Sequence, residues 1–349
     1  MDKLAYIARR LLLIIPTFLC ITFACVCLTR FLPGGPVERM TMKMRGMGGG
    51  GEVTASSQAA GASLPEEQLN QLKEQFGYDK PIYKQYYDWL VTNRMGMNLY
   101  SYNYPNKTAW ERIKSRIPIS LWFGLTAFFL TYLICIPLGI MKALKHRQAF
   151  DAFSSLVVFV SYAIPSFALG MALKALFCGT VDGLWDVFPL GGTSSEFFEE
   201  PTFWTWFCDR AWHMFLPICC YVAGSFAMLT LLMKNSLLDQ ISADYVRTVI
   251  AKGGSRRRAI WGHAFRNSLI PIATGIGPMI GLLFAGSIII ESIFEIPGMG
   301  RLSWEALVGR DYAVFLALLS LTATFQLVGN LISDILYMVI DPRIDFSRK

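Results

Sequence analysis

Six long stretches without Lys, Arg, Asp, Glu or His constrain this chain more than any other feature of its sequence. They comprise residues 11–29, 117–141, 152–173, 214–233, 267–290 and 312–333. Each is long enough to cross about 30 Å of hydrocarbon as a helix that rises about 1.5 Å per residue. Because a lone strand cannot satisfy its backbone hydrogen bonds in lipid, the sequence predicts an all-α integral membrane protein with six transmembrane helices.

The charged residues are scarce and unevenly placed. Only 16% of the 349 residues are charged and 54% are hydrophobic, whereas soluble globular proteins carry about 25% charged residues. This composition excludes an ordinary soluble enzyme. It also indicates that the net charge of +7 is a property of a membrane protein and not a sign of nucleic-acid binding.

The distribution of Lys and Arg predicts which way the chain faces. With a cytoplasmic N-terminus, the inside segments hold 16 basic residues against six acids; they are 1–10, 142–151, 234–266 and 341–349. In the two short outside loops, 179–211 and 291–311, the only basic residues are Arg210, Arg301 and Arg310. Since short cytoplasmic loops carry the excess of positive charge, both termini are expected inside.

The chain divides into four regions. Residues 1–32 are expected to form an uncleaved anchor helix, because their apolar run is too long for a signal peptide. A long outside loop follows at 33–116, with a flexible Gly-rich insertion at 41–63 and short helices at 69–76 and 82–90. Residues 117–341 form a five-helix core that includes an inside loop at 234–268, and 342–349 form a cytoplasmic tail.

No catalytic, cofactor-binding or metal-binding residues are predicted. The sequence contains no HExxH, CxxC, GxSxG or Walker A pattern, so any ATP must be hydrolysed by another chain. The three histidines, His146, His213 and His263, fall on two sides of the membrane and cannot form one metal cluster. Cys178 and Cys208 bracket the second outside loop, where a disulfide is one open alternative to two free thiols.

Two acids lie at the edges of the predicted spans. Glu291 follows the fifth window, and Asp334 follows the sixth. Acids in such places either line a path for a polar substrate or serve structure through an interfacial position or a polar partner. Both alternatives stay open for Glu291 and Asp334.

The inside loop at 234–268 has the most informative residue order. Residues 244–252 predict a short helix that Gly253 and Gly254 stop, followed by a basic turn and a second helix at 258–269. On composition alone, this loop would be positive charge facing anionic lipid.

The residue order of the loop nevertheless resembles the ATPase-coupling loop of ABC-importer permeases in the dipeptide/oligopeptide branch, B-type subunit. That loop reads approximately DYVRTARAKG, then an Arg-rich turn, then HxxRNxLxP. Matching positions are Asp244, Tyr245, Val246, Arg247, Thr248, Ala251, Lys252, Gly253, His263, Arg266, Asn267, Leu269 and Pro271. Val249 and Ile250 depart from the Ala and Arg of the pattern.

Segments outside the loop are similar to the same family. They are the PGGP at 33–36, the FGYDKP at 76–81, the PGMG at 297–300 and the DPRIDF at 341–346. The first and last of these, with the MKNS at 233–236, look most like the Yej-type subgroup, which is linked to oligopeptides and microcin C.

The resemblance implies a six-span permease in the bacterial inner membrane, with the 33–116 loop in the periplasm. Its partners would be a homologous C-type permease, two ATP-binding domains, separate or fused, and a periplasmic peptide-binding protein. Residues 244–253 would sit in a cleft of the ATPase, with Arg247 and Lys252 supplying electrostatic contacts and Tyr245 and Val249 supplying apolar ones. The ATPase would bind ATP and Mg²⁺, and this chain would bind no cofactor.

Two other classes of protein remain as alternatives. A secondary transporter or channel not coupled to ATP would need an inverted repeat or conducting groups at the midplane, which the sequence does not display. A membrane-embedded enzyme would need a catalytic constellation within the spans. Copurification with an ATPase and a second permease would discriminate the importer from both.

Overall fold

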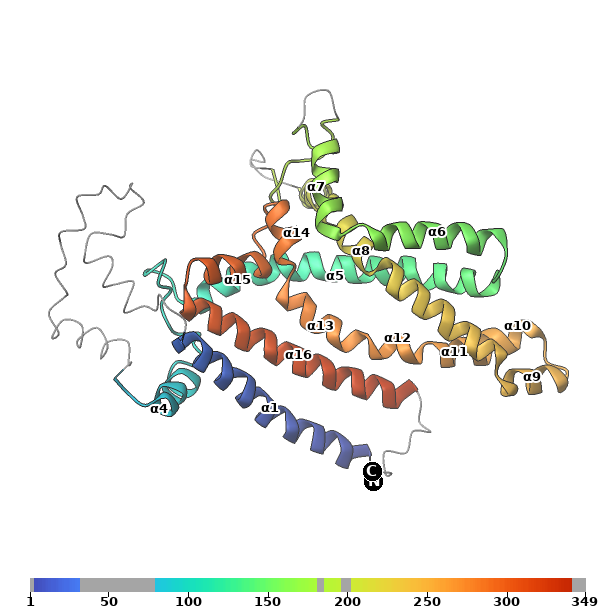
Figure 1. Ribbon diagram of the computed structural model, residues 1–349, viewed down its shortest axis with the longest axis horizontal. Coiled ribbons are helices and arrows are strands. Elements are labelled where there is room, and N and C mark those ends of the chain that lie inside the picture. The colour runs from blue at the N-terminus through green and yellow to red at the C-terminus, as the bar shows by residue number, and fades with distance from the viewer. Residues whose placement is uncertain (1–2, 32–78, 181–184, 196–201, 341–349) are drawn as a thin grey trace. The chain divides into compact units, whose positions relative to one another are not determined.

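The computed structural model of this chain describes residues 3–31, 79–180, 185–195 and 202–340 (Figure 1). Within these ranges the chain is helical, apart from turns and two isolated β-bridges. The insertion predicted at 41–63, the helix predicted at 69–76 and the tail at 342–349 lie outside the described residues.

Four long helices carry most of the apolar sequence. They are α1 (Lys3–Phe31), α5 (Ala109–Leu144), α8 (Phe203–Ser242) and α16 (Tyr312–Ile340). Each contains a segment long and apolar enough to cross a membrane. These helices contain the windows at 11–29, 117–141, 214–233 and 312–333, so four of the six predicted spans are confirmed as continuous helices of sufficient length.

The third predicted span is not one straight helix. The chain forms α6 (Ala149–Ala163) and α7 (Ser166–Phe177), and the two are bent by 93°. Pro165 follows α6, and the residue before it, Ile164, is extended with φ −90° and ψ 117°, as the proline ring requires. By length and composition the described chain therefore has four possible spans, or five if this bent pair is one.

The fifth predicted span is also broken. Residues 267–290 fall mainly on α12 (Ile270–Thr274), α13 (Ile276–Ala285) and the start of α14 (Ile288–Ile293). Gly286 separates α13 from α14 with φ +70°, a backbone conformation that glycine adopts without steric cost. A charge-free window thus marks apolar surroundings, but it does not guarantee a continuous helix, and the six-span arrangement stays a prediction.

Contacts divide the described chain into two compact units. The larger comprises Met1–Ile14, Arg116–Leu302 and Thr322–Lys349, and the smaller comprises Ile15–Ser115 and Ser303–Leu321. In the larger unit α8 contacts α6, α7, α12 and α14. One of its apolar clusters includes Phe123 of α5, Met214 of α8 and Phe294 after α14.

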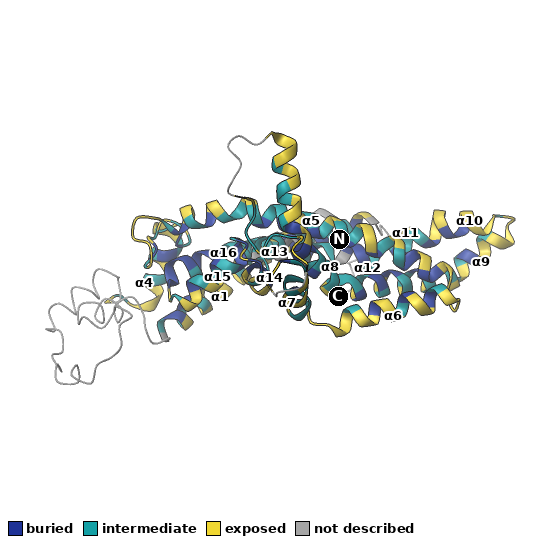
Figure 2. Ribbon diagram, turned by 90° about the horizontal axis from the view of Figure 1, so that it is seen from above, coloured by how far each residue is buried: buried dark blue, intermediate teal, exposed yellow. Residues whose placement is uncertain are grey.

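Apolar side chains also cover much of the outside of the helices. On α6, Phe153, Leu156 and Phe159 are 69%, 61% and 58% exposed, and Figure 2 shows exposed residues recurring along this helix. Such a large apolar surface is unfavourable in water and is typical of helices surrounded by lipid or a partner subunit.

The smaller unit contains the second short helix predicted in the first loop. This helix is α4 (Ile82–Tyr87), continued by the π-helix η2 (Asp88–Thr92). Tyr86 lies 2.8 Å from the hydroxyl oxygen of Thr22 on α1, and its ring meets the Phe23 ring edge-on at 5.2 Å. The predicted helix at 82–90 is confirmed, and these contacts hold it against α1.

A buried acid organises the rest of the smaller unit. Asp311 is fully buried and accepts hydrogen bonds from the Ser101 hydroxyl and the Tyr102 amide, the latter at 3.1 Å. Arg112 lies 3.8 Å from the same carboxylate. The loop before α5 is thereby fixed to the residues just before α16, because a buried carboxylate requires such partners.

Candidate coupling site

The inside loop folds as two short helical arms joined by a tight turn. The first arm is α9 (Asp244–Ala251). The second arm runs through α10 (Arg256–Ala259), the π-helix η3 (Ile260–Ala264) and α11 (Phe265–Ser268). Both predicted helices of the loop are therefore confirmed, and the second begins two residues earlier than expected.

Glycine makes the turn between the arms. Gly253 has φ +85°, and its amide donates to the Ile250 carbonyl at 3.0 Å. A Cβ atom on Gly254 would lie 2.8 Å from the carbonyl oxygen of Val249. Ser255 then caps the second arm by accepting a hydrogen bond from the Arg258 amide at 3.3 Å. The predicted stop of the first helix at Gly253 and Gly254 is confirmed, and its physical basis is a left-handed residue with no room for a side chain beside it.

One face of α9 is buried in the protein. Val246 is 3% exposed. It belongs to an apolar cluster, here called the base cluster, with Ile140, Ala143, Met233, Leu237, Ala259, Ala264 and Ile272. The Tyr245 hydroxyl also donates to the Gln240 side chain of α8 at 2.7 Å. The α9 helix thus packs on the end of α8 and on the second arm, in a cluster that also includes Ile140 and Ala143 of α5.

The opposite face of α9 is exposed and mostly polar. It consists of Asp244, Arg247, Thr248, Ile250 and Ala251, with Lys252 beyond the helix end. The side chain of Arg247 is 75% exposed and lies 3.7 Å from Asp244, which is 97% exposed. Ile250, at 45%, is the large apolar side chain on this face. The residues available to a partner are therefore mostly charged or hydroxylic, with Ile250 as the one large apolar side chain and Ala251 as a small one.

The predicted coupling residues differ in how far they are exposed to a partner. Tyr245 and Val249, expected to supply apolar contacts to an ATPase, are half-buried against the base cluster. Arg247 and Lys252, expected to supply electrostatic contacts, are exposed. Contact with the ATPase itself stays a prediction for all four.

The remaining predicted coupling residues lie on the second arm. His263 and Arg266 are exposed, and Asn267 is half-buried. Beside them, the buried carbonyl of Ser268 accepts a hydrogen bond from the Ser236 hydroxyl of α8 at 2.9 Å. The structure therefore brings both arms of the loop to α8, and each arm leaves a polar face uncovered.

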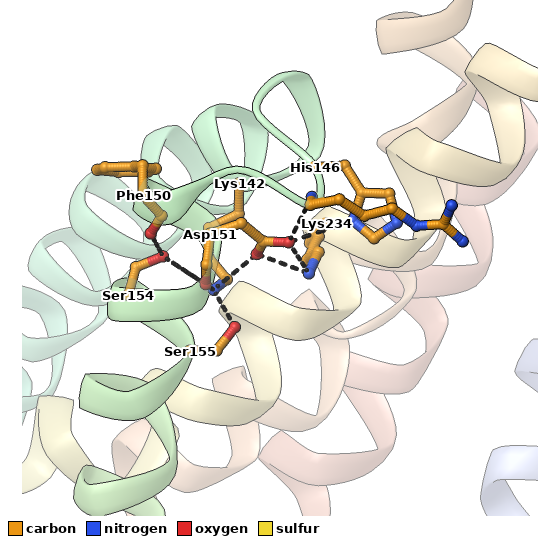
Figure 3. Close-up of polar contacts among 8 residues, drawn as sticks. Lys142, His146, Phe150, Asp151, Ser154, Ser155 and Lys234 are labelled. Carbon is orange, nitrogen blue, oxygen red and sulfur yellow. Dashed lines mark hydrogen bonds and ion pairs between the residues drawn. The ribbon is translucent and has the colours of Figure 1, made fainter.

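A cluster of charges that sequence reasoning missed lies nearby on α5, α6 and α8 (Figure 3). Asp151 of α6 accepts hydrogen bonds from Lys234 of α8 at 2.7 and 2.9 Å. Lys142 of α5, fully buried, lies 3.2 Å from the same carboxylate. The sequence did hold a signal, because the three charges flank three apolar windows on the same predicted side, but an excess of inside charge already explained them.

The two acids proposed for a translocation path are engaged within the chain. Glu291 is fully buried, and its carboxylate accepts hydrogen bonds from the amides of Ser287 at 3.0 Å and Arg301 at 2.7 Å. Asp334 of α16 lies 3.2 Å from Arg10 of α1. Structural roles account for both sets of contacts, and a path role for either acid stays a prediction.

The two cysteines proposed for a disulfide are free thiols in the structure. Cys178 is buried, whereas Cys208 on α8 is exposed. The structure therefore does not join this pair. Among the described residues, no group of three or more His, Cys, Asp and Glu side chains is arranged to hold a metal ion.

Comparison with known protein families identifies the region that contains this loop. Residues 135–346 match the family described as binding-protein-dependent transport system inner membrane component. The matched stretch includes both arms of the loop, the base cluster and the charges on α5, α6 and α8. It therefore covers the candidate coupling site as a whole.

Full-length relatives agree with this match. The chain is 36% identical to a peptidoglycan transport system permease protein, YejB, of Agrobacterium fabrum, with 99% of each chain covered. It is 35% identical to the inner membrane ABC transporter permease protein YejB of Escherichia coli O157:H7, over 98% of this chain and 99% of the relative. It is 33% identical to the dipeptide transport system permease protein DppB of Escherichia coli K12, with 98% of each covered. This chain belongs to the family of binding-protein-dependent transport system inner membrane components, the permeases of ABC importers.

Proposed function

We propose that this chain forms one half of the translocation path of an ATP-driven peptide importer, and that α9 receives the motion of the partner ATPase. The observation that carries this proposal is the two-sided character of α9. Its inner face is buried on α8 and the second arm, in a cluster shared with α5, and its outer face presents exposed charge. When a partner displaces the outer face of such a helix, the buried contacts of its inner face transmit the displacement to the helices on which it packs.

The proposed partners follow from the same geometry and from the family. The exposed Arg247 and Lys252 would meet an acidic cleft of an ATP-binding domain, where complementary charge favours correct docking. ATP and Mg²⁺ would be bound and used there. A homologous C-type permease would complete the path, and a periplasmic binding protein would deliver the peptide to it.

The proposed orientation places both termini and the 234–268 loop in the cytoplasm of a bacterium, with this chain in the inner membrane. The distribution of basic residues supports this orientation. The ion pair between Arg10 and Asp334 supports one part of this orientation, namely that the first part of α1 and the last part of α16 lie on the same side of the membrane.

Peptides are the proposed substrate class, with oligopeptides first and microcin C-like peptides as a variant. The name of the dipeptide permease relative from Escherichia coli K12 favours peptides. Peptide-bearing fragments of peptidoglycan are a second candidate, because the relative from Agrobacterium fabrum is named for peptidoglycan transport at 36% identity. Competition between a short peptide and a cell-wall peptide fragment in one uptake assay separates the two candidates.

The proposal is tested in membrane vesicles that contain the whole importer, by uptake of labelled peptide and by ATP hydrolysis stimulated by the binding protein. Arg247→Glu should abolish both, because it reverses the charge that faces the ATPase. Gly253→Pro should do the same, because proline fixes φ near −65° and cannot adopt the +85° of the turn.

The control is Lys114→Glu, the same charge reversal at an exposed site on α5. It should insert and transport like the unaltered chain. Full stimulation of ATP hydrolysis in Arg247→Glu, with normal insertion, would refute the proposed role of α9.

A further inference from the structure

We infer that Asp151 and Lys234 form a charged clamp that makes α5, α6 and α8 move together when α9 is displaced, which makes both of them positioning residues for transport. The inference rests on the proposed function of α9. It adds a set of contacts through which a displacement of α8 is transmitted to α5 and α6.

The clamp has one acid at its centre and a helix on each side (Figure 3). Asp151 lies in the first turn of α6 and is 6% exposed. Both of its carboxylate oxygens accept hydrogen bonds from the Lys234 ammonium group, and one of them lies 3.2 Å from Lys142. The acid also accepts a hydrogen bond from the Arg147 amide at 3.3 Å, which holds the turn between α5 and α6.

The two lysines are bound in different ways. Lys142 has further acceptors on α6, namely the Asp151 carbonyl at 3.1 Å and the hydroxyls of Ser154 and Ser155 at 2.9 and 2.7 Å. The ammonium group of Lys234 bonds only to the Asp151 carboxylate among the described contacts. Loss of Lys234 therefore removes the ionic link between α8 and α6. It leaves in place the link between α5 and α6 and the hydrogen bond at 3.3 Å from the Ser161 hydroxyl of α6 to the Ala223 carbonyl of α8.

The clamp lies on the part of α8 that also seats α9. Lys234 immediately follows Met233 and comes three residues before Leu237, and both of these apolar residues belong to the base cluster with Val246. On α5, Ile140 and Ala143 of the same cluster flank Lys142. A displacement of α9 thus acts on the segments of α5 and α8 that Asp151 joins through charge.

Burial makes this link stiff. A charge-assisted hydrogen bond with little access to water is stronger and better defined in geometry than an exposed pair. Apolar contacts between α6 and α8, by comparison, permit small sliding movements of packed helices. The charged clamp is therefore the ionic contact that makes the first turn of α6 follow α8, whereas the neutral hydrogen bond from Ser161 to the Ala223 carbonyl lies near the other end of α6.

The deciding experiment measures peptides imported per ATP hydrolysed by the reconstituted importer, with assembled complex counted in parallel. Lys234→Met should lower this ratio about tenfold, the size of effect that coupling within a charged network produces. Assembly of the complex should stay normal in this variant, because the positive charge of Lys142 still balances the negative charge of Asp151. Lys234→Arg should restore most of the ratio, because it keeps the charge and the reach.

Asp239→Asn is the matched control, since this acid lies exposed on α8 five residues after Lys234. It should leave the ratio unchanged. An unchanged ratio in Lys234→Met would overturn the clamp, and so would an equal loss in Asp239→Asn.

A second pair of variants separates coupling from folding. Asp151→Asn should reduce both assembly and the ratio, because it leaves the buried Lys142 charge unbalanced. Adding Lys142→Met should restore assembly and leave the ratio low. Recovery of the ratio together with assembly would show a purely structural role and overturn the clamp. Failure of the unaltered importer to couple uptake to ATP would instead refute the proposed function itself.

Discussion

Two buried acids of the larger unit, Asp151 and Glu291, hold the chain together by different means. Asp151 accepts hydrogen bonds from lysine side chains that belong to other helices. Glu291 accepts them from backbone amides of its own segment, at Ser287 and Arg301. The first acid therefore joins elements far apart in the sequence, whereas the second shapes one continuous stretch.

The surroundings of Glu291 show how local its role is. The carboxylate binds the first turn of α15 (Met299–Val308), where free amides and the helix dipole favour negative charge. A side chain at Gly298 would displace this carboxylate, because a Cβ atom there would lie 2.5 Å from one of its oxygens. The PGMG residues at 297–300 thus surround the Glu291 carboxylate. A substitution among them should disturb the structure of this segment before that of other helices.

The largest effect is expected at Asp151. Asp151→Asn removes the carboxylate that pairs with two lysines, Lys142 and Lys234, the first of which is fully buried. Removing one partner of a buried ion pair costs about 3–5 kcal/mol of unfolding free energy. Thermal unfolding in detergent should show a markedly lower midpoint. A midpoint equal to that of the unaltered chain would mean that the lysines do not depend on this acid.

An intermediate effect is expected at Glu291. Glu291→Gln keeps the shape but replaces one accepting oxygen by an NH₂ group that faces a backbone amide, which costs about 1–3 kcal/mol. Hydrogen exchange should accelerate at the Ser287 and Arg301 amides and stay unchanged in α6. Faster exchange in both places would contradict the local role inferred for this acid.

The smallest effect is expected at Asp334, whose side chain is 27% exposed and pairs with a half-exposed Arg10. Asp334→Asn should cost less than about 1 kcal/mol, because water already screens such a pair. The thermal midpoint should barely move, and peptide uptake should persist if the acid has a structural role only. Loss of uptake with normal stability would instead favour a place on the translocation path.

The coupling loop was predictable because its information lies in consecutive residues. The order from Asp244 to Gly253 specifies a short helix, and a glycine with positive φ specifies its end. The inward turn of Tyr245 and Val249 was not predictable from that order. It depends on apolar residues of α5 and α8 that are far away in the sequence.

The bends in the membrane helices were predictable only in part. Pro165 was visible in the third window, yet prolines also occur within the continuous helices α5 and α8. A proline can accompany a 93° bend or lie within a continuous helix. The outcome depends on what packs against it and on which groups satisfy the freed carbonyl oxygens.

By itself, the sequence determined that this is a membrane protein and which loop resembles an ATPase contact, and it predicted the side of the membrane on which each loop lies. Each of these depends on composition or on neighbouring residues, which the sequence states directly. Only the tertiary structure decided which face of α9 is left for a partner, that Asp151 joins three helices and that Glu291 is enclosed by its own backbone. Those outcomes depend on which distant side chains share a buried volume, where every charge must find a partner.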